Sequence, residues 1–262
     1  MYKIKQALAY IHPDAQIAPT VEISPFVSID ENVVIGDGTC IGSNVRIMEG
    51  VRIGKNCTIF PGTVIGAIPQ DLKFKGEETL VVIGDNSTIR EYVTINKGTV
   101  AKGKTVIGNN CLIMAYCHVA HDCIVGNNVI MANATQLAGE VVVDDFAILS
   151  GAVLVHQFTH IASHVMIQGA SKVNKDVPPF VKAGRDPLSY AGINSVGLRR
   201  RSFTNEQIQN IQNVYRYLYQ MGLNTTHAIE RIEAELPPTK EGDEILRFVR
   251  NSSRGIIKGY FE

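Results

Sequence analysis

Residues 11–65 read IHPDAQIAPTVEISPFVSIDENVVIGDGTCIGSNVRIMEGVRIGKNCTIFPGTVI, and an isoleucine occupies every sixth position from the first residue of this stretch to the last. The same phase returns at Ile83 and, apart from one skipped position at 101, continues to Val173. Together these positions make 25 anchors, all Ile, Val, Leu or Met. A period of six excludes an amphipathic helix and simple strand alternation, whose apolar positions recur at 3.6 and at two residues.

Stacked coils are the remaining way to bury such a repeat. Three six-residue faces close a coil of 18 residues, and successive coils pair as parallel strands about 4.8 Å apart. A second register, four residues after each anchor, holds small side chains, and glycine often follows the anchor, as at Gly36 and Gly54, where the chain turns and a Cβ would clash. The sequence therefore predicts a mainly β chain, a parallel β-helix of roughly eight coils.

Composition excludes several classes of protein. Lys and Arg together equal Asp and Glu at 25 each, so no overall charge draws the chain to nucleic acid. No run of 18 apolar residues indicates an integral membrane segment, and the N-terminus lacks a signal-peptide pattern. Five cysteines, an odd number, favour a reducing compartment and hence the cytoplasm. Four of them fall in the small second register and are expected to be inert and buried: Cys57, Cys111, Cys117 and Cys123.

Two insertions, near 66–82 and 96–106, interrupt the repeat without changing its phase. Such loops leave from one corner of a solenoid and are common places for function. The repeat ends at DVPPF, and helical periodicity follows, with helices expected from the Thr204 capping box to Gly222, over 226–236 and over 243–251. We expect residues 1–186 to form the β-helix and residues 187–262 a small α-helical domain that covers its end.

Histidines gather in the second half of the repeat, at positions 118, 121, 156, 160 and 164. His118, His121 and His156 lie beside anchors, so they face outward and within about two coil spacings of one another. They could bind zinc, as in β-helical carbonic anhydrases, but no spacing singles out a converging triad. Alternatively, His121 could act as a general base with Asp122 fixing its tautomer. We expect no metal and no cofactor.

Five motifs, together with the hexapeptides, match one known family. They are QDLKFKGE at 70–77, HVAHDC at 118–123, VHQF at 155–158, DVPPF at 176–180 and GIN…GLRRRSF at 192–203. Hexapeptides alone indicate only a broad superfamily, but with these motifs the chain resembles, over essentially its whole length, the UDP-N-acetylglucosamine acyltransferases of the lipid A pathway.

The resemblance implies a left-handed coil, an exception to the usual right-handed crossover, and a homotrimer with active sites between subunits. It implies transfer of a 3-hydroxyacyl chain from acyl carrier protein to the glucosamine 3-hydroxyl of UDP-N-acetylglucosamine, the first step of lipid A synthesis. In that reaction His121 would be the general base, Asp122 would orient it, and the backbone N–H of Gly139 would stabilise the tetrahedral oxyanion.

The resemblance also implies binding residues. Contacts to the sugar, the diphosphate and the nucleotide are expected from Asp71, Lys73, His118, Glu140, His156, Gln157, Asn194, Arg200 and Arg201. The arginines belong to the densest basic run of the chain, which suits phosphate or the acidic carrier protein. Gly169 is expected to leave the acyl groove open for a long chain. The sequence departs from the family at Glu140, where relatives commonly carry histidine, and at Val196, where they often carry an acidic residue.

Three other functions remain open from the sequence. The N-acyltransferase acting later in the same pathway normally carries an extra N-terminal domain, for which repeats beginning at Ile11 leave no room. A structural or ligand-binding solenoid would need neither the HxxHD motif nor polar insertions that keep the phase. A zinc-dependent hydratase would need a metal.

Overall fold

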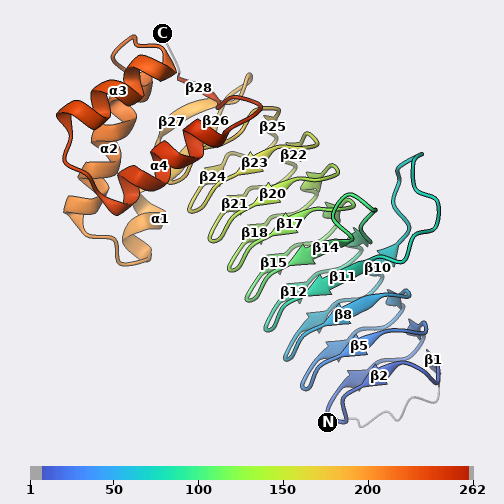
Figure 1. Ribbon diagram of the computed structural model, residues 1–262. Coiled ribbons are helices and arrows are strands. Elements are labelled where there is room, and N and C mark those ends of the chain that lie inside the picture. The colour runs from blue at the N-terminus through green and yellow to red at the C-terminus, as the bar shows by residue number, and fades with distance from the viewer. Residues whose placement is uncertain (1–7, 260–262) are drawn as a thin grey trace.

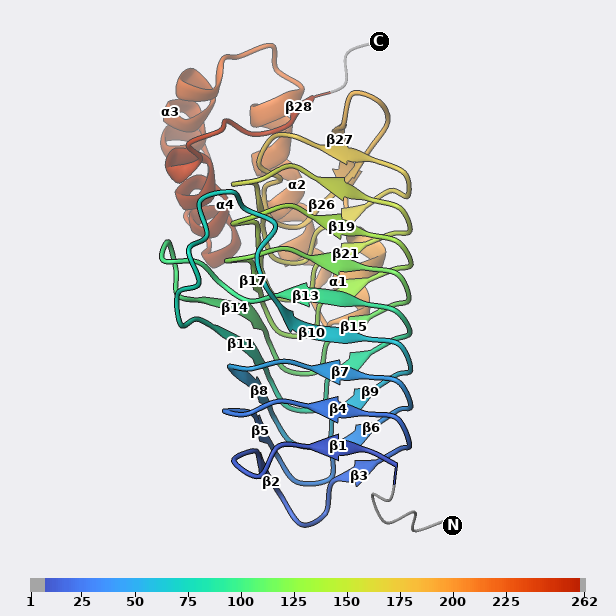
Figure 2. The same cartoon turned by 90° about the vertical axis from the view of Figure 1, so that its right-hand side faces the viewer.

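Three parallel sheets form the walls of a triangular prism (Figures 1 and 2). The structure is a computed structural model and describes residues 8–259. From β1 to β25 the chain visits the three sheets in turn, so strands in this range pair with the strand three places along the chain. This arrangement confirms the expected fold class, a left-handed parallel β-helix.

The sheets are named here by the order in which the chain enters them. Sheet A contains β1 (Tyr10–Ile11), β4 (Ser28–Ile29), β7 (Arg46–Ile47), β10 (Val64–Ala67), β13 (Thr94–Asn96), β16 (His118–Val119), β19 (Gln136–Leu137), β22 (Leu154–Val155) and β25 (Lys172–Val173). Sheet B contains β2 (Gln16–Ile17), β5 (Val34–Ile35), β8 (Val51–Ile53), β11 (Leu80–Ile83), β14 (Lys104–Ile107), β17 (Ile124–Val125), β20 (Val142–Val143) and β23 (His160–Ile161). Sheet C contains β3 (Glu22–Ile23), β6 (Cys40–Ile41), β9 (Thr58–Ile59), β12 (Thr88–Ile89), β15 (Leu112–Ile113), β18 (Ile130–Met131), β21 (Ile148–Leu149), β24 (Met166–Ile167), β26 (Val181–Gly184), β27 (Ser189–Ile193) and β28 (Lys258–Gly259).

The anchors fill the axis of the prism, as the period predicts. From Ile23 to Val173 every anchor is buried, and only Ile11 and Ile17, at the open end, are partly exposed. The small second register is buried beside them. Its cysteine thiols donate to carbonyl groups of the following coil; Cys123 Sγ, for example, lies 3.1 Å from the Ala138 oxygen. Burial raises the pKa of Cys123 to about 12, so the predicted inert packing of this thiol is confirmed.

Each corner has two requirements, close stacking of the coils and a turn of the chain, and they fall on two different residues. From the sequence, both were expected at the glycine after the anchor. A Cβ on Gly36, directly after an anchor, would lie 2.8 Å from the Gly54 backbone carbon, so glycine is needed there for close stacking of coils. The left-handed backbone that turns the chain comes two residues later, at positions such as Asn44, Asn56 and Tyr116. Many of these residues are asparagine, which tolerates positive φ better than most side chains.

The C-terminal region adds four helices beside the last coils (Figure 1): α1 (Ser195–Arg200), α2 (Asn205–Tyr219), α3 (Thr225–Glu235) and α4 (Lys240–Asn251). The Thr204–Gln207 capping box is present at the start of α2, as predicted. The short helix α1 and the antiparallel pair β26–β27 were not expected. Because β27 continues sheet C beyond residue 186, the division into domains at 186/187 stays a prediction.

Candidate active site

One corner of the prism carries both insertions and His121. We call the corner between sheets A and B the AB corner, and name the BC and CA corners in the same way. The first insertion follows β10, the second follows β13, and His121 follows β16. These three strands are neighbours in sheet A, so three successive coils bring the two loops and His121 to the AB corner. Figure 2 shows both loops leaving the same side of the prism.

His121 and Asp122 form a hydrogen-bonded pair at this corner. His121 Nδ1 lies 2.8 Å from Asp122 Oδ2, and the carboxylate is fully buried while the imidazole is partly exposed. Burial raises the pKa of Asp122, but hydrogen bonds from Thr99, His121 and Lys102 outweigh it and leave the pKa below its ordinary value. The ionised carboxylate thus holds the Nδ1–H tautomer, which leaves Nε2 as the basic nitrogen.

The second insertion is the support of Asp122, a role that the sequence did not reveal. Thr99 donates from its backbone N–H to Asp122 Oδ1 at 2.9 Å and from its hydroxyl to Oδ2 at 2.6 Å. The Lys102 N–H donates a third bond to Asp122 Oδ1 at 3.2 Å, and the backbone N–H of Asp122 itself donates to the Thr105 hydroxyl at 2.9 Å. The one sequence signal for this role was that the six-residue repeat keeps its phase on both sides of the second insertion. A loop that leaves the repeat in phase is anchored at both ends.

If His121 acts as a general base, we expect Thr99→Val to lower kcat by about tenfold while KM stays near the wild-type value. The change keeps the shape and the backbone N–H but removes the hydroxyl bond to Asp122, so the carboxylate orients the imidazole less firmly. Steady-state kinetics of the variant, with Thr99→Ser as the matched control that restores the hydroxyl, measures the effect. An equal loss in the serine variant would contradict a positioning role for this hydroxyl.

Gly139 lies directly against the His121 ring. A Cβ at this position would come within 2.5 Å of His121 Nε2 and 2.6 Å of Cε1, so only glycine fits. Its N–H donates no hydrogen bond within residues 8–259. At the BC corner, by contrast, the equivalent N–H of Asn109 is capped by the Asn127 side chain at 2.9 Å. An uncapped backbone donor beside a basic nitrogen is the arrangement that acyl transfer uses.

A groove of about 540 Å³ lies on the outer face of sheet A, next to this corner. His118, Leu154, His156 and Lys172 line it. The His118 ring is hydrogen-bonded to the Thr94 hydroxyl at 2.7 Å, and burial lowers the pKa of His118, so its ring is neutral at pH 7. His156 is exposed and bonds through Nδ1 to the Gln157 carbonyl. The structure thus brings His118 and His156 to one groove.

The remaining two histidines of the cluster lie elsewhere. His160 belongs to β23 in sheet B and pairs with Asp144 at 2.8 Å. His164 lies at the BC corner and stacks on Phe146 and Phe180. Burial, with the charge of Arg201, lowers the pKa of His164 to about 4. In the part of the chain that is described, no three His, Cys, Asp or Glu side chains converge in a way that could hold a metal ion.

The residues expected at the nucleotide end are not beside His121 in the single chain. The Asn194 side-chain amide donates to the His164 carbonyl at 2.9 Å and also caps α1. Arg201 donates to the Phe146 carbonyl at 3.2 Å and lies over that ring. Both therefore belong to the BC corner, whereas His121 belongs to the AB corner. The adjacent Arg200 is exposed and makes no ion pair with any residue in the range 8–259.

The first insertion presents the other expected binding residues. Asp71 Oδ1 accepts a hydrogen bond from the Lys73 backbone N–H at 2.9 Å and so fixes a local turn. The Lys73 side chain is exposed. Leu72 between them is also fully exposed. The loop offers a carboxylate and an ammonium group on the side of the prism that carries His121.

Comparisons with known proteins agree with this geometry. The profile described as Udp N-acetylglucosamine O-acyltransferase, Domain 2, matches residues 176–257, and the bacterial transferase hexapeptide profile matches 104–139. A curated acyl-carrier-protein–UDP-N-acetylglucosamine O-acyltransferase of Thermodesulfovibrio yellowstonii is 49% identical over 251 residues, which cover 95% of this chain and 97% of that protein. The chain belongs to this O-acyltransferase family.

Solved structures place the chain in the same family. A UDP-N-acetylglucosamine acyltransferase from Bacteroides fragilis is 58% identical, with a TM-score of 0.95 over 96% of this chain and 99% of that one. The enzyme of Francisella novicida is 42% identical, with a TM-score of 0.93 over 96% of this chain and 93% of that one. The N-acyltransferase, the hydratase and the binding solenoid are therefore not favoured.

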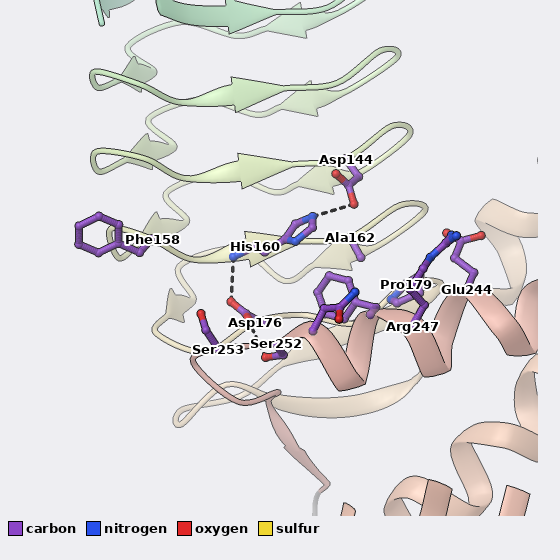
Figure 3. A pocket seen from close by; sticks show the side chains of 12 residues that line it. Asp144, Phe158, His160, Ala162, Asp176, Pro179, Glu244, Arg247, Ser252 and Ser253 are labelled. Atoms are coloured by element: carbon purple, nitrogen blue, oxygen red, sulfur yellow. Dashed lines mark hydrogen bonds and ion pairs between the residues drawn. The ribbon is translucent and has the colours of Figure 1, made fainter. Parts of the chain in front are cut away.

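A second hollow of this O-acyltransferase, about 290 Å³, lies between sheet B and α4 (Figure 3). Asp144 points to His160, and Asp176 accepts hydrogen bonds from the His160 backbone N–H at 2.9 Å and from the Ser252 hydroxyl at 2.6 Å. These bonds satisfy the polar groups internally and tie α4 to the last coils. The residues around this hollow therefore serve to pack α4 against the β-helix.

The O-acyltransferase has no helix, within residues 8–259, whose length and apolar character would let it cross a membrane. The two departures from the family pattern lie on different corners. Glu140 is half-buried at the AB corner, one residue after Gly139, and Val196 is exposed on α1 near the BC corner.

Proposed function

We propose that this O-acyltransferase transfers a 3-hydroxyacyl group from acyl carrier protein to the 3-hydroxyl of UDP-N-acetylglucosamine, with His121 as general base. The observation that carries the proposal is the joint placement of three groups. Asp122 holds Nδ1 of His121, and Gly139, whose N–H is uncapped, lies beside Nε2 on the other side of the ring. One acyl carbonyl can then meet the sugar hydroxyl and the oxyanion donor together.

The reaction needs one proton carrier and one oxyanion donor. The oxygen of the sugar hydroxyl attacks the thioester carbonyl, and His121 Nε2 takes the hydroxyl proton in the same step. Negative charge develops on the carbonyl oxygen and is stabilised by the Gly139 N–H, while the Asp122 carboxylate stabilises the imidazolium. When the C–S bond breaks, the imidazolium returns its proton to the leaving sulfur. The products are the sugar ester and the carrier thiol.

The groove on sheet A is suited to the acyl chain. It runs along the prism axis over β16, β19, β22 and β25, because His118, Leu154 and Lys172 occupy the same register position on neighbouring strands. Gly169 lies in the turn that precedes β25, at the CA corner, and is exposed. An acyl chain that crosses sheet A from His121 would reach Gly169 at its far end, which supports a role in limiting chain length.

Gly169→Met should shift the preference of the enzyme toward shorter 3-hydroxyacyl donors. A Cβ at this position would lie 3.1 Å from the Gly151 carbonyl oxygen, so a small local adjustment accommodates it, and the long side chain would obstruct an acyl chain that reaches the CA corner. We expect kcat/KM for the longest accepted donor to fall by about tenfold or more, in line with the methylene discrimination of apolar pockets. A donor panel of graded length measures this, and an unchanged length profile would exclude the role of Gly169.

A homotrimer would complete the binding site. The CA corner carries exposed aromatic side chains, and Tyr92 and Tyr116 stack there with ring centroids 5.4 Å apart. If three CA corners meet on a threefold axis, sheet A of one subunit faces sheet C of the next. The AB corner of one subunit then lies beside the BC corner of its neighbour, and Arg200 and Arg201 approach the site of His121 from the partner.

This arrangement divides substrate binding between two subunits. From one chain, Asp71, Lys73, His118, His156 and Gln157 contact the sugar and diphosphate, with Glu140 at the same corner. From the other, Arg200 and Arg201 contact the nucleotide, for which planar guanidinium groups are well suited, and Asn194 positions the turn that presents them. Asn194 acts mainly through the α1 turn that it caps, because its amide is already engaged.

The direct test is acyl transfer by the purified chain from a panel of 3-hydroxyacyl carrier proteins to UDP-N-acetylglucosamine. Formation of the 3-O-acyl product supports the proposal. Acylation of an amino sugar acceptor and not of UDP-N-acetylglucosamine would instead identify an N-acyltransferase. We place the reaction in the cytoplasm, at the first step of lipid A synthesis. The free thiols of Cys40, Cys57, Cys111, Cys117 and Cys123 are consistent with a reducing compartment.

A further inference from the structure

A loop with uncompensated positive charge lies next to the catalytic pair. Residues 97–105, which we call the lysine loop, read KGTVAKGKT and contain three lysines and no acidic residue. The chain as a whole has no net charge. Lys97, Lys102 and Lys104 make no ion pair within residues 8–259, and the last two are exposed. The charge is therefore available to a partner.

The neighbouring first insertion does not share this character. Its two lysines, Lys73 and Lys75, are offset by Asp71, Glu77 and Glu78. The positive charge at the AB corner is thus concentrated in the lysine loop, which Figure 2 shows on the outside of the prism beside β14.

The tip of the lysine loop adds an apolar contact point. The Val100 side chain is 76% exposed between the lysines. The base of the loop is firmly held, because the Gly98 carbonyl accepts from the buried Thr79 hydroxyl at 2.6 Å and Thr99 bonds Asp122 twice. An ordered basic loop with one exposed apolar residue is a preorganised docking element.

We propose that the lysine loop docks the acyl carrier protein through its acidic surface, a proposal that rests on the function given above. The loop holds Asp122 directly, so a carrier bound there delivers its thioester next to His121 and Gly139. Complementary charge raises the rate of encounter more than the strength of the final complex. Screening by salt should therefore weaken the interaction.

The substitutions Lys102→Glu and Lys104→Glu, made together, test the proposal. They reverse two side-chain charges and keep the Lys102 backbone N–H that bonds Asp122. We expect KM for the acyl carrier protein donor to rise by roughly tenfold, and the salt dependence of kcat/KM to decrease. Lys102→Gln with Lys104→Gln should give an intermediate effect.

Two comparisons make the result decisive. Lys240→Glu with Lys258→Glu reverses the same number of exposed charges in the C-terminal region, and should leave KM for the carrier donor unchanged. A 3-hydroxyacyl pantetheine thioester, which lacks the protein, should react with the loop variant as it does with the wild type. An equal loss with this small donor would mean that the changes act through Asp122 and would overturn docking. So would an unchanged KM for the carrier donor, whereas absence of transfer by the wild type would instead refute the proposed function.

Discussion

Replacing His121 with alanine lowers kcat for acyl transfer by about 10²- to 10⁴-fold, the range that general base catalysis contributes. Nε2 of His121 faces Gly139, while Nδ1 is held by the buried Asp122 carboxylate, and alanine removes the nitrogen that would take the sugar proton. KM for UDP-N-acetylglucosamine should change much less than kcat, because several other side chains bind the sugar nucleotide. Initial-rate kinetics with both substrates varied measures the split.

His227→Ala is the matched control, since His227 is exposed on α3 and, within residues 8–259, hydrogen-bonds the Asn224 cap of its own helix and no other side chain. Its kinetics should match the wild type. Both variants should keep the fold, because His121 lies outside the aliphatic axis and Asp122 keeps its hydrogen bonds from Thr99 and Lys102. Near-normal turnover by His121→Ala with an intact fold would rule out His121 as the base.

Gly139→Ala should lower kcat by about 10²- to 10³-fold, comparable to the removal of an oxyanion donor. The added Cβ would lie 2.5 Å from His121 Nε2, so the ring must rotate and lose its geometry with Asp122. The same methyl group also closes the approach of the acyl carbonyl to the N–H of residue 139. Single-turnover measurements separate the chemical step from donor binding.

Gly151→Ala provides the comparison for this change. Gly151 occupies the same place in the repeat, two residues after an anchor, but the nearest atom to its Cβ would be the Asn133 oxygen at 3.4 Å. Alanine fits there, so kcat should stay within about twofold of wild type, as is usual for surface changes that disturb no packing. If both alanine variants lose activity equally, close packing of Gly139 on His121 is not the cause.

The repeat made most of the solenoid predictable. Each anchor from Ile23 to Val173 is buried as the period requires, because every six-residue unit repeats the same packing problem and stacking is its common solution. The capping box at Thr204 was equally readable, since both of its side chains act within one turn. The hairpin of β26 and β27 was not, because its pairing depends on contact with the last coil.

The candidate site was predictable only in part. The pairing of His121 with Asp122 could be predicted because the two residues are adjacent in the sequence. The role of Gly139 was predicted from the family resemblance. Thr99 was missed, since its link to Asp122 spans 23 residues and an insertion. The separation of Arg201 from His121 was also hidden, because a position in the sequence does not say which corner an appended helix will pack on.

The sequence by itself determined the stacked coils, the buried cysteines and the corner residues that could carry chemistry, because a six-residue period fixes which side chains face in and which face out. Only the tertiary structure decided which residues share a corner. Coil stacking makes direct neighbours of residues 18, 24 or 30 positions apart, so Thr94 comes to His118. The folded path of the second insertion brings Thr99 to Asp122, 23 residues further along the chain. The helical packing likewise sends Asn194 and Arg201 to the BC corner, away from the AB corner that carries His121.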